Sequence, residues 1–511
     1  GDSQMASILT NTSAMVALQN LRTINRSLTD TQNQIATGKK IATAKDNSAI
    51  WAVSKVLESD VNAFKAISDS LNLGDATVAV ARQASETVSE ILTELKGNIV
   101  AAQEENIDRS KIQDDITAKV DQIQSIVAAA QFNGLSLVSG TEDISILGSL
   151  ERDSTGIVTA SYIDIARSDL TTNAGTYNSG GTDLTPNVTL SNATVSDAAN
   201  TAVVTFNGSG ADYDGATATL TVAGVQVDFT GTTGDTEVEA ADHFAAQINA
   251  LGIEGVTASA ASGALTVSST RSFETADVAV SGLTGNAAGS EITNLNGAAV
   301  TVASGTIDQR AESLTFSDSA FVNDGDGYQV SFGGEVFRYI AGPGESFEDV
   351  ARGLKASVDG GAVDGVTTLV SQDSTTGAWV LNVDNDSATS LTATIDGRDG
   401  GVASGGLFGL DGIDVSTNDS ARAALDNIDT FLNTAIDAAA SFGSSQSRID
   451  LQAGFISKLT DSLKTGIGSL VDADLEAASA RLQALQVQQQ LGIQSLAIAN
   501  QAPQSVLSLF R

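Results

Sequence analysis

Apolar side chains recur at helical spacing at both ends of the chain. The C-terminal stripe advances mostly in steps of three or four residues and consists of Leu475, Ala478, Leu482, Leu485, Ile493 and Leu496. The N-terminal stripe has intervals of three and seven residues and consists of Leu18, Leu21, Leu28 and Ile35. Each stripe predicts an amphipathic helix that is marginally stable alone. We therefore expect the two terminal helices to pair, as in the a/d seam of a coiled coil.

Three further helices are predicted between the terminal ones. Alternating three- and four-residue steps run from Asn47 to Ala102 and predict one long helix, which restarts after a break at Gly38. A second helix is expected over 108–130, with Asn133-Gly134 supplying the left-handed residue that stops it. A third follows the same register from Leu425 to Leu463. These three helices should form one bundle from both ends of the chain.

The part of the chain between these helices has the pattern of strands. Residues 141–166 alternate apolar and polar positions around Asp153-Ser154-Thr155-Gly156, which predicts a β-hairpin. Glycine is concentrated between the helical ends, so the middle is rich in turns. A divergent repeat of strands, helix and strands covers about 216–267 and again about 328–383.

These patterns predict an α+β multidomain fold in which a coiled-coil-like α-helical bundle is built from both chain ends and a β-rich middle is inserted. Residues 1–46 and 468–511 are assigned to the paired terminal helices. Residues 47–170 and 415–467 are assigned to the helical bundle with its hairpin. Residues 171–414 are assigned to a β-rich outer region that contains two small α+β modules at about 210–270 and 325–395.

Composition narrows the function classes. The formal charge of −36 and the pI near 4.1 make nucleic acid and anionic membranes poor partners. The absence of cysteine excludes disulfides and thiolate metal sites. With His243 as the single histidine, the H-E-x-x-H zinc motif is excluded. We expect no transmembrane span and no cleaved signal peptide. Met5 has the look of a natural start, with a longer natural start as the alternative.

Candidate chemical groups have plainer interpretations. For His243, a position at the surface or at a boundary is favoured by about nine to one over a role as a ligand or pH switch. The run Asn323-Asp324-Gly325-Asp326-Gly327 has the oxygen-rich composition of a calcium loop, but it lacks the glutamate that an EF-hand places downstream. A β-turn is favoured there and at Asp384-Asn385-Asp386. No catalytic constellation is visible, so we expect no enzyme activity, no metal and no cofactor.

Four motifs occur in order along the two ends of the chain: Ile41-Ala42-Thr43-Ala44-Lys45-Asp46-Asn47-Ser48-Ala49, Gln131-Phe132-Asn133-Gly134, Ser447-Arg448-Ile449 and Ala499-Asn500-Gln501-Ala502-Pro503-Gln504. Together they resemble bacterial flagellin. The resemblance covers roughly residues 5–165 and 415–511 and implies a subunit that polymerises into the extracellular flagellar filament for swimming. It also implies type III export without a cleaved signal, and as partners an export chaperone and the cap and hook-associated proteins besides the subunit itself.

The resemblance also assigns contact roles to particular residues. Subunit contacts in the inner core fall to Leu18, Leu21, Leu28, Ile35, Leu482, Leu485, Ile493 and Leu496. Contacts in a second helical layer fall to Lys45, Asp46, Gln131, Asn133 and Arg448. For Lys45-Asp46 the plain alternative is a helix cap beside a solvated lysine. For the terminal stripes it is the core of an ordinary helical bundle.

Two other functions stay open at this stage. The hook–filament junction protein resembles flagellin in its terminal patterns, although the long glycine-rich middle favours the filament subunit. A surface adhesin that binds carbohydrate through the middle region is the alternative from a different class. The aromatic residues of that region are scattered, which gives the adhesin little support.

A stretch of the long helix bears on recognition by a host. Flagellins sensed by the vertebrate Toll-like receptor for flagellin resemble one another in the pattern Gln-Arg-x-Arg-Glu-Leu, upstream of Gln-Phe-Asn-Gly. The corresponding positions here are Glu90, Ile91, Thr93, Glu94 and Leu95, so only the last two match. Isoleucine and threonine lack the charged, planar donors of arginine. We expect this chain to evade that receptor, with Ile91 and Thr93 lying off the apolar core of the helix.

Overall fold

The computed structural model describes residues 11–104, 106–152, 157–361 and 363–509. The chain divides into two compact units. The terminal unit consists of Gly1–Asp75, Ser145–Asp164 and Gln446–Arg511, and the central unit consists of Ala76–Ile144 and Ile165–Ser445. Each unit is therefore assembled from segments that are far apart in the sequence.

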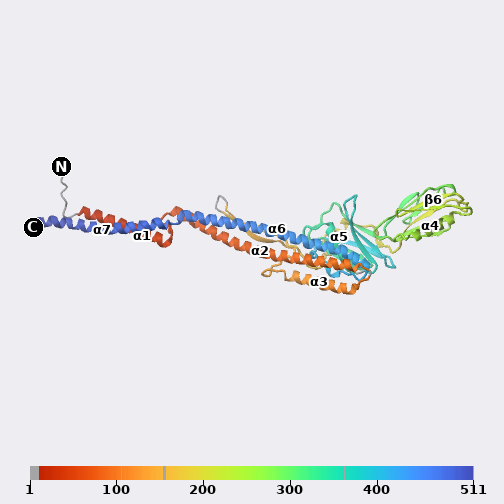
Figure 1. Cartoon of the computed structure of the whole chain (residues 1–511), viewed down its shortest axis with the longest axis horizontal. Helices are drawn as coiled ribbons and strands as arrows, with labels where there is room; N and C mark the ends of the chain where they lie inside the picture. The colour runs from red at the N-terminus through yellow and green to blue at the C-terminus, as the bar shows by residue number, and fades with distance from the viewer. Residues whose placement is uncertain (1–10, 105, 153–156, 362, 510–511) are drawn as a thin grey trace. The chain divides into compact units, whose positions relative to one another are not determined.

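The terminal unit is built on helices α1 (Thr12–Thr37) and α7 (Leu475–Leu509), which lie side by side (Figure 1). The Asn11 side chain caps α1 by accepting a hydrogen bond from the Ala14 amide at 3.0 Å. The same helix ends at Gly38, whose φ of 68° provides the left-handed turn that a side chain would resist. The break predicted at Gly38 is confirmed.

Two long helices, α2 (Ser48–Ala102) and α6 (Asn418–Val471), contribute to both units. Within the terminal unit, the turn after α1 is bonded to the link between α6 and α7. The Lys40 amide donates to the Val471 carbonyl at 2.7 Å, and the Ala473 amide donates to the Gly38 carbonyl at 3.0 Å. The turn at the end of α1 and the link at the start of α7 are thus hydrogen-bonded to each other.

A β-hairpin of β1 (Ile144–Arg152) and β2 (Val158–Ile165) lies where the alternating pattern predicts one. Its strands are anchored on both long helices of the terminal unit. Gly74 of α2 leaves room for the Ile146 side chain, and the Gln452 amide of α6 donates to the Gly148 carbonyl at 3.0 Å. The turn predicted at 153–156 lies outside the described residues.

Besides its parts of α2 and α6, the central unit contains a third long helix, α3 (Arg109–Ala129). Their buried apolar side chains include Val88, Leu92, Leu95, Ile116, Val120, Ile123, Ile428 and Phe442. The predicted bundle is therefore present, with one difference at the end of α3. This helix stops at Ala129, and Asn133 (φ 52°) and Gly134 (φ 80°) instead form a separate left-handed turn that brings Phe132 back against Leu135.

The β-rich part of the central unit contains two modules. Module 1 comprises β5 (Asn200–Thr205), β6 (Thr217–Val222), β7 (Val225–Thr230), α4 (Glu237–Leu251), β8 (Val256–Ala261), β9 (Ala264–Ser269), β10 (Ala276–Ser281), β11 (Glu291–Leu295), β12 (Ala298–Val302) and β13 (Ser304–Ile307). Module 2 comprises β3 (Val188–Leu190), β4 (Thr194–Val195), β14 (Glu312–Phe316), β15 (Gly327–Phe332), β16 (Glu335–Ile340), α5 (Phe347–Gly360), β17 (Val366–Gln372), β18 (Trp379–Asn385) and β19 (Leu391–Arg398). Short 3-10 turns lie at Thr185–Asn187, Gly285–Ala287 and Leu410–Gly412.

Each module encloses its core between two antiparallel sheets and one helix. The sheet orders are β13-β10-β6-β7 and β12-β11-β5-β9-β8 in module 1, and β16-β15-β19-β4 and β17-β18-β14-β3 in module 2. Both helices begin with a capping box, Thr236 with Glu239 in α4 and Ser346 with Asp349 in α5. Phe244 and Leu354 project from these helices into the two cores.

The strands and helices of the predicted repeat are present in both modules, but the modules extend further than the repeat. Strands β6 to β9 with α4 have the same order as β15 to β18 with α5. Module 2 also takes its edge strands β3 and β4 from residues that precede module 1. Module 1 is consequently an insertion within module 2. Local periodicity could not reveal this, because the strand pairs that show it are more than one hundred residues apart.

Candidate assembly surface

Helices α1 and α7 meet along a seam with the three- and four-residue steps of a coiled coil. On α1 the least exposed positions in this register are Ala14, Ala17, Leu21, Ile24, Leu28, Thr31 and Ile35. On α7 they are Ala478, Leu482, Leu485, Gln489, Gly492, Leu496 and Ala499. Many of these residues are small or polar, so the seam has a modest apolar core.

Small and polar residues set the spacing of the two helices. A Cβ at Gly492 would lie 3.2 Å from Leu21 Cδ1, so this glycine lets α1 approach closely. The Gln489 amide donates to the Asn25 side chain at 2.7 Å, and the Asn11 amide donates to the Ala499 carbonyl at 2.9 Å. These two bonds tie the register of α1 to that of α7, one near the middle of the seam and one at its end.

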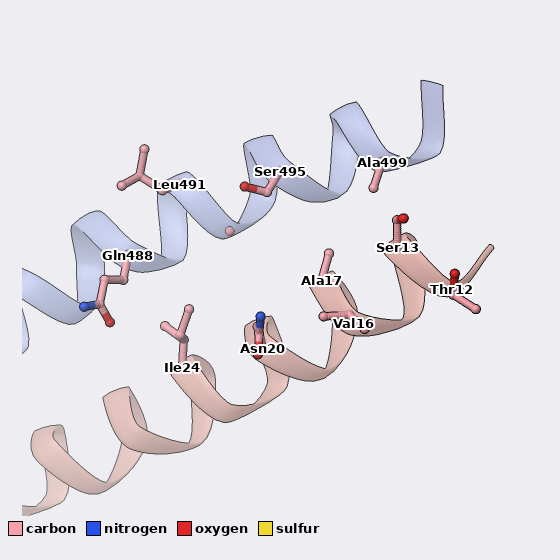
Figure 2. Close-up of a pocket in the computed structure, with 11 residues that line it drawn as sticks. Thr12, Ser13, Val16, Ala17, Asn20, Ile24, Gln488, Leu491, Ser495 and Ala499 are labelled. Carbon is pink, nitrogen blue, oxygen red and sulfur yellow. The ribbon is translucent and has the colours of Figure 1, made fainter. Parts of the chain in front are cut away.

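A groove of about 630 Å³ runs beside the seam between the two helices. Figure 2 shows Ala17 and Ile24 pointing from α1 toward α7, whereas Leu491 points away from α1. Val16 and Leu491, which both line the groove, are more than half exposed. The groove is therefore bordered by apolar side chains that the α1–α7 pair leaves uncovered.

These side chains belong to a larger set of exposed apolar residues distributed around the outside of the pair, here called the terminal apolar face. It consists of exposed residues of α1 and α7, namely Met15, Val16, Leu18, Val487, Leu491, Ile493 and Ile498. Within α7, charge is carried only by Glu476 and Arg481 among the residues of the printed sequence. A long helix with exposed apolar residues and few charges is typical of a surface that another protein covers.

The structure divides the predicted inner-core residues between the seam and this face. Leu21, Leu28, Ile35, Leu482, Leu485 and Leu496 lie in the seam. Leu18 and Ile493 lie outside it, with exposed fractions of 39% and 54%. The expectation that these two help to pair the helices is wrong, because the seam positions nearest to them are filled by Ala17 and Gly492, which an apolar-residue count overlooks.

The predicted second-layer residues are exposed, each on its own turn or helix. Lys45 and Asp46 lie in the turn between α1 and α2, Gln131 and Asn133 lie after α3, and Arg448 lies on α6. Lys45, Asp46 and Arg448 belong to the terminal unit, whereas Gln131 and Asn133 belong to the central unit.

Asp46 organises its turn rather than capping the following helix. Its Oδ2 accepts hydrogen bonds from the amides of Thr43 (2.8 Å) and Ala42 (3.0 Å) and from the Thr43 hydroxyl (3.1 Å). The bond from the Thr43 amide is the main cause that lowers the pKa of this carboxyl below its ordinary value of 3.8. The next residue, Asn47, supplies the helix cap by accepting from the Ile50 amide at 3.2 Å.

The helix stretch considered for receptor recognition is only partly exposed. Glu90, Thr93 and Glu94 are exposed, and Glu94 pairs with Lys119 of α3. Ile91, by contrast, is only 7% exposed. The expectation that Ile91 lies off the core is wrong, because α2 is paired with α6 through Lys96 and Asp429 as well as with α3 through Glu94 and Lys119, so more than one side of it is covered.

The other candidate groups have structural roles. His243 lies at a boundary, with its Nε2 at 3.1 Å from the Asp228 carbonyl and its ring packed on Phe229. The Asp326 amide donates to the Asn323 carbonyl at 3.0 Å, which makes the predicted β-turn. The β-turn expected at Asp384-Asn385-Asp386 is wrong for its first two residues, which end strand β18.

The described part of the chain holds no group of three or more acidic or histidine side chains arranged to bind a metal. Among the described helices, none is long and apolar enough to span a membrane.

The geometry therefore defines a class: a structural subunit whose two ends pair into a helical stem with an uncovered apolar face. Comparison with known proteins identifies the family. The sequence model of the bacterial flagellin N-terminal helical region matches residues 8–143, and that of the C-terminal helical region matches residues 425–510. Flagellin A of Rhizobium meliloti is 32% identical over 514 residues, which cover 99% of this chain and 100% of the relative.

Flagellin B of the same organism is 30% identical over 516 residues, covering 99% of this chain and 100% of the relative. Among solved structures, the FlgL protein of Xanthomonas campestris aligns with 80% of this chain and 99% of its own, at 10% identity and a TM-score of 0.25. The chain belongs to the bacterial flagellin family. It is a non-enzymatic subunit of the extracellular flagellar filament, which decides against the junction-protein alternative.

Proposed function

We propose that the terminal apolar face is the surface through which α1–α7 pairs of neighbouring copies form the inner layer of the filament. The observation that carries this proposal is the exposure of large apolar side chains on both helices of the pair. Burying a side chain of this size contributes about 1.5–3 kcal/mol, so one face supplies a large driving force for association. Contacts between unlike faces that do not close on themselves generate a filament.

Leu18 and Ile493 contribute to this proposed contact as members of the face, and the seam residues contribute by holding the pair together. Lys45, Asp46, Gln131, Asn133 and Arg448 are proposed to contact neighbours in a second helical layer. Their exposure supports this role, as does the well-bonded turn around Asp46. The β-rich residues 171–414 are proposed to lie outside both layers.

Deletion of the chain from Leu485 onward tests the proposal. The shortened protein should stay soluble, and its central unit should melt as in the intact chain, because none of that unit is removed. It should not extend filament seeds, because α1 loses most of its partner in the seam. Sedimentation after seeding measures this outcome. Filaments of normal diameter from the shortened chain would refute the role of the α1–α7 pair.

The terminal apolar face is also the basis for the partners that we propose for the subunit before and after it joins the filament. An export chaperone is expected to cover the apolar residues of α7, and the cap and hook-associated proteins are expected to bind the helical ends of a subunit at the filament termini. Substitution of Val487 and Leu491 together by serine tests the first of these. The variant should bind its cognate chaperone at least tenfold more weakly in calorimetry, since about 1.4 kcal/mol corresponds to a factor of ten.

Evasion of the vertebrate receptor is proposed on the basis of Glu90, Ile91 and Thr93, with Glu94 and Leu95 conforming to the sensed pattern. The buried position of Ile91 changes the test, because Ile91→Arg would place a charge in the core. Thr93→Arg restores one donor at an exposed site. A receptor-reporter assay should show no signal for the wild type. Stimulation by the wild-type monomer would refute the proposal.

A further inference from the structure

Charge is unevenly divided between the two units of the chain. The segments of the terminal unit carry 13 basic and 15 acidic residues, whereas those of the central unit carry 13 basic and 47 acidic residues. Almost the whole formal charge of −36 therefore belongs to the central unit. Because like charges on neighbouring copies repel, assembly is favoured by contacts that bring cations of one copy against the central unit of another.

The turn between α1 and α2 presents two exposed cations that its own copy leaves unpaired. Lys40 and Lys45 are exposed, and neither ammonium group forms an ion pair or a hydrogen bond with another described residue. By contrast, Lys39 and Lys55 share one carboxylate, that of Glu58, at 3.4 Å and 2.6 Å. Lys40 and Lys45 are thus the lysines of this region that remain available to a partner.

The carboxylates beside the turn are engaged elsewhere in the chain. Asp46 accepts hydrogen bonds from the amides of the turn, and the charge of Lys45 is the smallest of the causes that lower the pKa of its carboxyl. Asp474 caps α7 by accepting from two amides of its first turn, both at 3.0 Å. Asp472 lines a separate pocket of about 380 Å³ with two other lysines. In the described part of the chain, none of these carboxylates neutralises the two exposed lysines through a direct contact.

The backbone that carries the two lysines is fixed. The Lys40 amide donates to the Val471 carbonyl at 2.7 Å, and the next residue, Ile41, is only 7% exposed. On the other side, the Asp46 amide donates to the Thr43 carbonyl at 3.0 Å. Because the backbone is already ordered, only the lysine side chains lose freedom when they enter a contact, which lowers the entropy cost of binding.

We propose that Lys40 and Lys45 bind carboxylates on the central unit of a neighbouring copy. Each ammonium group offers three donors to carboxylate oxygens. Charge complementarity favours a second copy as the partner, because its central unit carries an excess of 34 acidic residues. The contact joins unlike surfaces of two copies, which extends a filament when it does not close on itself. It rests on the second-layer role proposed above for Lys45, adds Lys40 to that role and names the chemistry of the partner.

Seeded polymerisation of the full-length chain tests this contact. The double variant Lys40→Gln/Lys45→Gln should raise the critical concentration about threefold or more at about 0.01 M salt, because two charge pairs are lost. Its difference from the wild type should shrink at about 1 M salt, where the Debye length is only about 3 Å. The monomer should melt as the wild type does, because both side chains are exposed. Lys40→Arg/Lys45→Arg keeps both charges and should assemble normally.

The double variant Lys65→Gln/Lys458→Gln is the matched control. It removes two charges from exposed positions of α2 and α6 in the same unit, away from the turn. Its critical concentration should stay near that of the wild type. An equal rise in both double glutamine variants would show that net charge alone governs assembly, which would overturn the contact. An unchanged critical concentration of Lys40→Gln/Lys45→Gln at low salt would overturn it as well.

Carbodiimide cross-linking identifies the partner carboxylates directly, because this reagent joins a lysine amine and an adjacent carboxylate in an amide bond. Filaments grown from a mixture of unlabelled and isotope-labelled chains should yield mixed-label peptides that link Lys40 or Lys45 to acidic residues of 76–144 or 165–445. Links confined to one copy, or to carboxylates of the terminal unit, would refute the contact alone. Failure of the wild type to extend seeds would refute the proposed assembly together with it.

Discussion

A buried ion pair joins the two β-rich modules at the scale of single residues. Arg310 and Asp384 are 5% and 1% exposed, and they meet through two bonds of 2.8 Å and 2.7 Å. Ser272 donates to the same carboxylate at 2.9 Å, and the Arg310 amide donates to the Arg271 carbonyl at 2.9 Å. One side-chain pair therefore fixes the strand end of module 2 to the linkers at the base of module 1.

Replacement of Arg310 by alanine should destabilise this junction by about 3–5 kcal/mol, because the Asp384 carboxylate is left buried and unpaired. Asp386→Asn is the matched control. Asp386 also bonds Arg310, at 3.0 Å, but its side chain is 74% exposed, so its loss should cost less than about 1 kcal/mol. Denaturant unfolding followed by tryptophan fluorescence measures both values. Equal losses in the free energy of unfolding for the two substitutions would contradict the conclusion that the buried Arg310–Asp384 pair holds the two modules together.

Asp46 gives a residue-scale prediction that depends on pH. In the folded protein the pKa of the Asp46 carboxyl lies below its ordinary value of 3.8. The charged carboxylate therefore stabilises the turn fully above pH 3.8, and this stabilisation is lost as the pH falls through the lowered pKa. Asp46→Asn should speed hydrogen exchange of the Ala42 and Thr43 amides several-fold at pH 7. Lys45→Gln should leave these amides protected. Exchange mass spectrometry on the monomer reads both variants.

At the scale of elements, the two faces of α7 have separable tasks. Leu485 is 8% exposed in the seam, whereas Val487 is 56% exposed on the terminal apolar face. Figure 2 shows the same division, with Ile24 of α1 pointing toward α7 and Leu491 of α7 pointing away from it. Pairing within one copy and association between copies thus depend on different residues of one helix.

Leu485→Ala should weaken the α1–α7 pair by about 2 kcal/mol, the low end for a leucine truncation, because the seam is bordered by solvent. Faster hydrogen exchange of α7 in the monomer is the expected signal. Val487→Ala should leave monomer exchange unchanged and instead raise the critical concentration for filament growth. If both substitutions acted on the same measurement, the seam and the face would not be distinct.

The helices and their pairing could be predicted from the sequence because periodic apolar positions report which side of a helix is buried. The seam itself could not be assigned residue by residue. Gln489, Gly492 and Thr31 occupy it on account of close helix approach and side-chain bonds, which hydrophobic spacing does not register. The pocket between the end of α3 and residues 167–173 was also missed, since its residues are brought together by the pairing of 168–171 with segments near 138 and 406.

At the scale of the whole molecule, the chain enters and leaves the β-rich middle at one point. The Thr176 amide donates to the Val402 carbonyl, and the Val402 amide donates to the Thr176 carbonyl, both at 2.9 Å. The chain therefore leaves and re-enters the rest of the central unit at adjacent residues. A second link is the buried Lys355 of α5, which donates to Asn427 of α6 at 3.1 Å.

Excision of residues 177–401 with a short glycine linker should preserve filament assembly and give a thinner fibre in electron micrographs, since Thr176 and Val402 are already paired. The monomer should melt at a lower temperature than the intact chain, because removal of Lys355 uncovers Asn427 and its buried neighbours on α6. Loss of assembly by a shortened chain that keeps its helical content would place the middle within the subunit contact.

The insertion of module 1 within module 2 has a consequence for how such surfaces diversify. The Asn200 amide bonds the carbonyls of both Asp308 (3.2 Å) and Gln309 (2.9 Å), so the first and last residues of module 1 lie together. A stretch of gene encoding 200–307 is thus a cassette whose two ends lie together, and recombination can exchange it whole without altering α1, α2, α3, α6 or α7. The β-rich middle and the helices built from the two chain ends are therefore free to evolve at different rates.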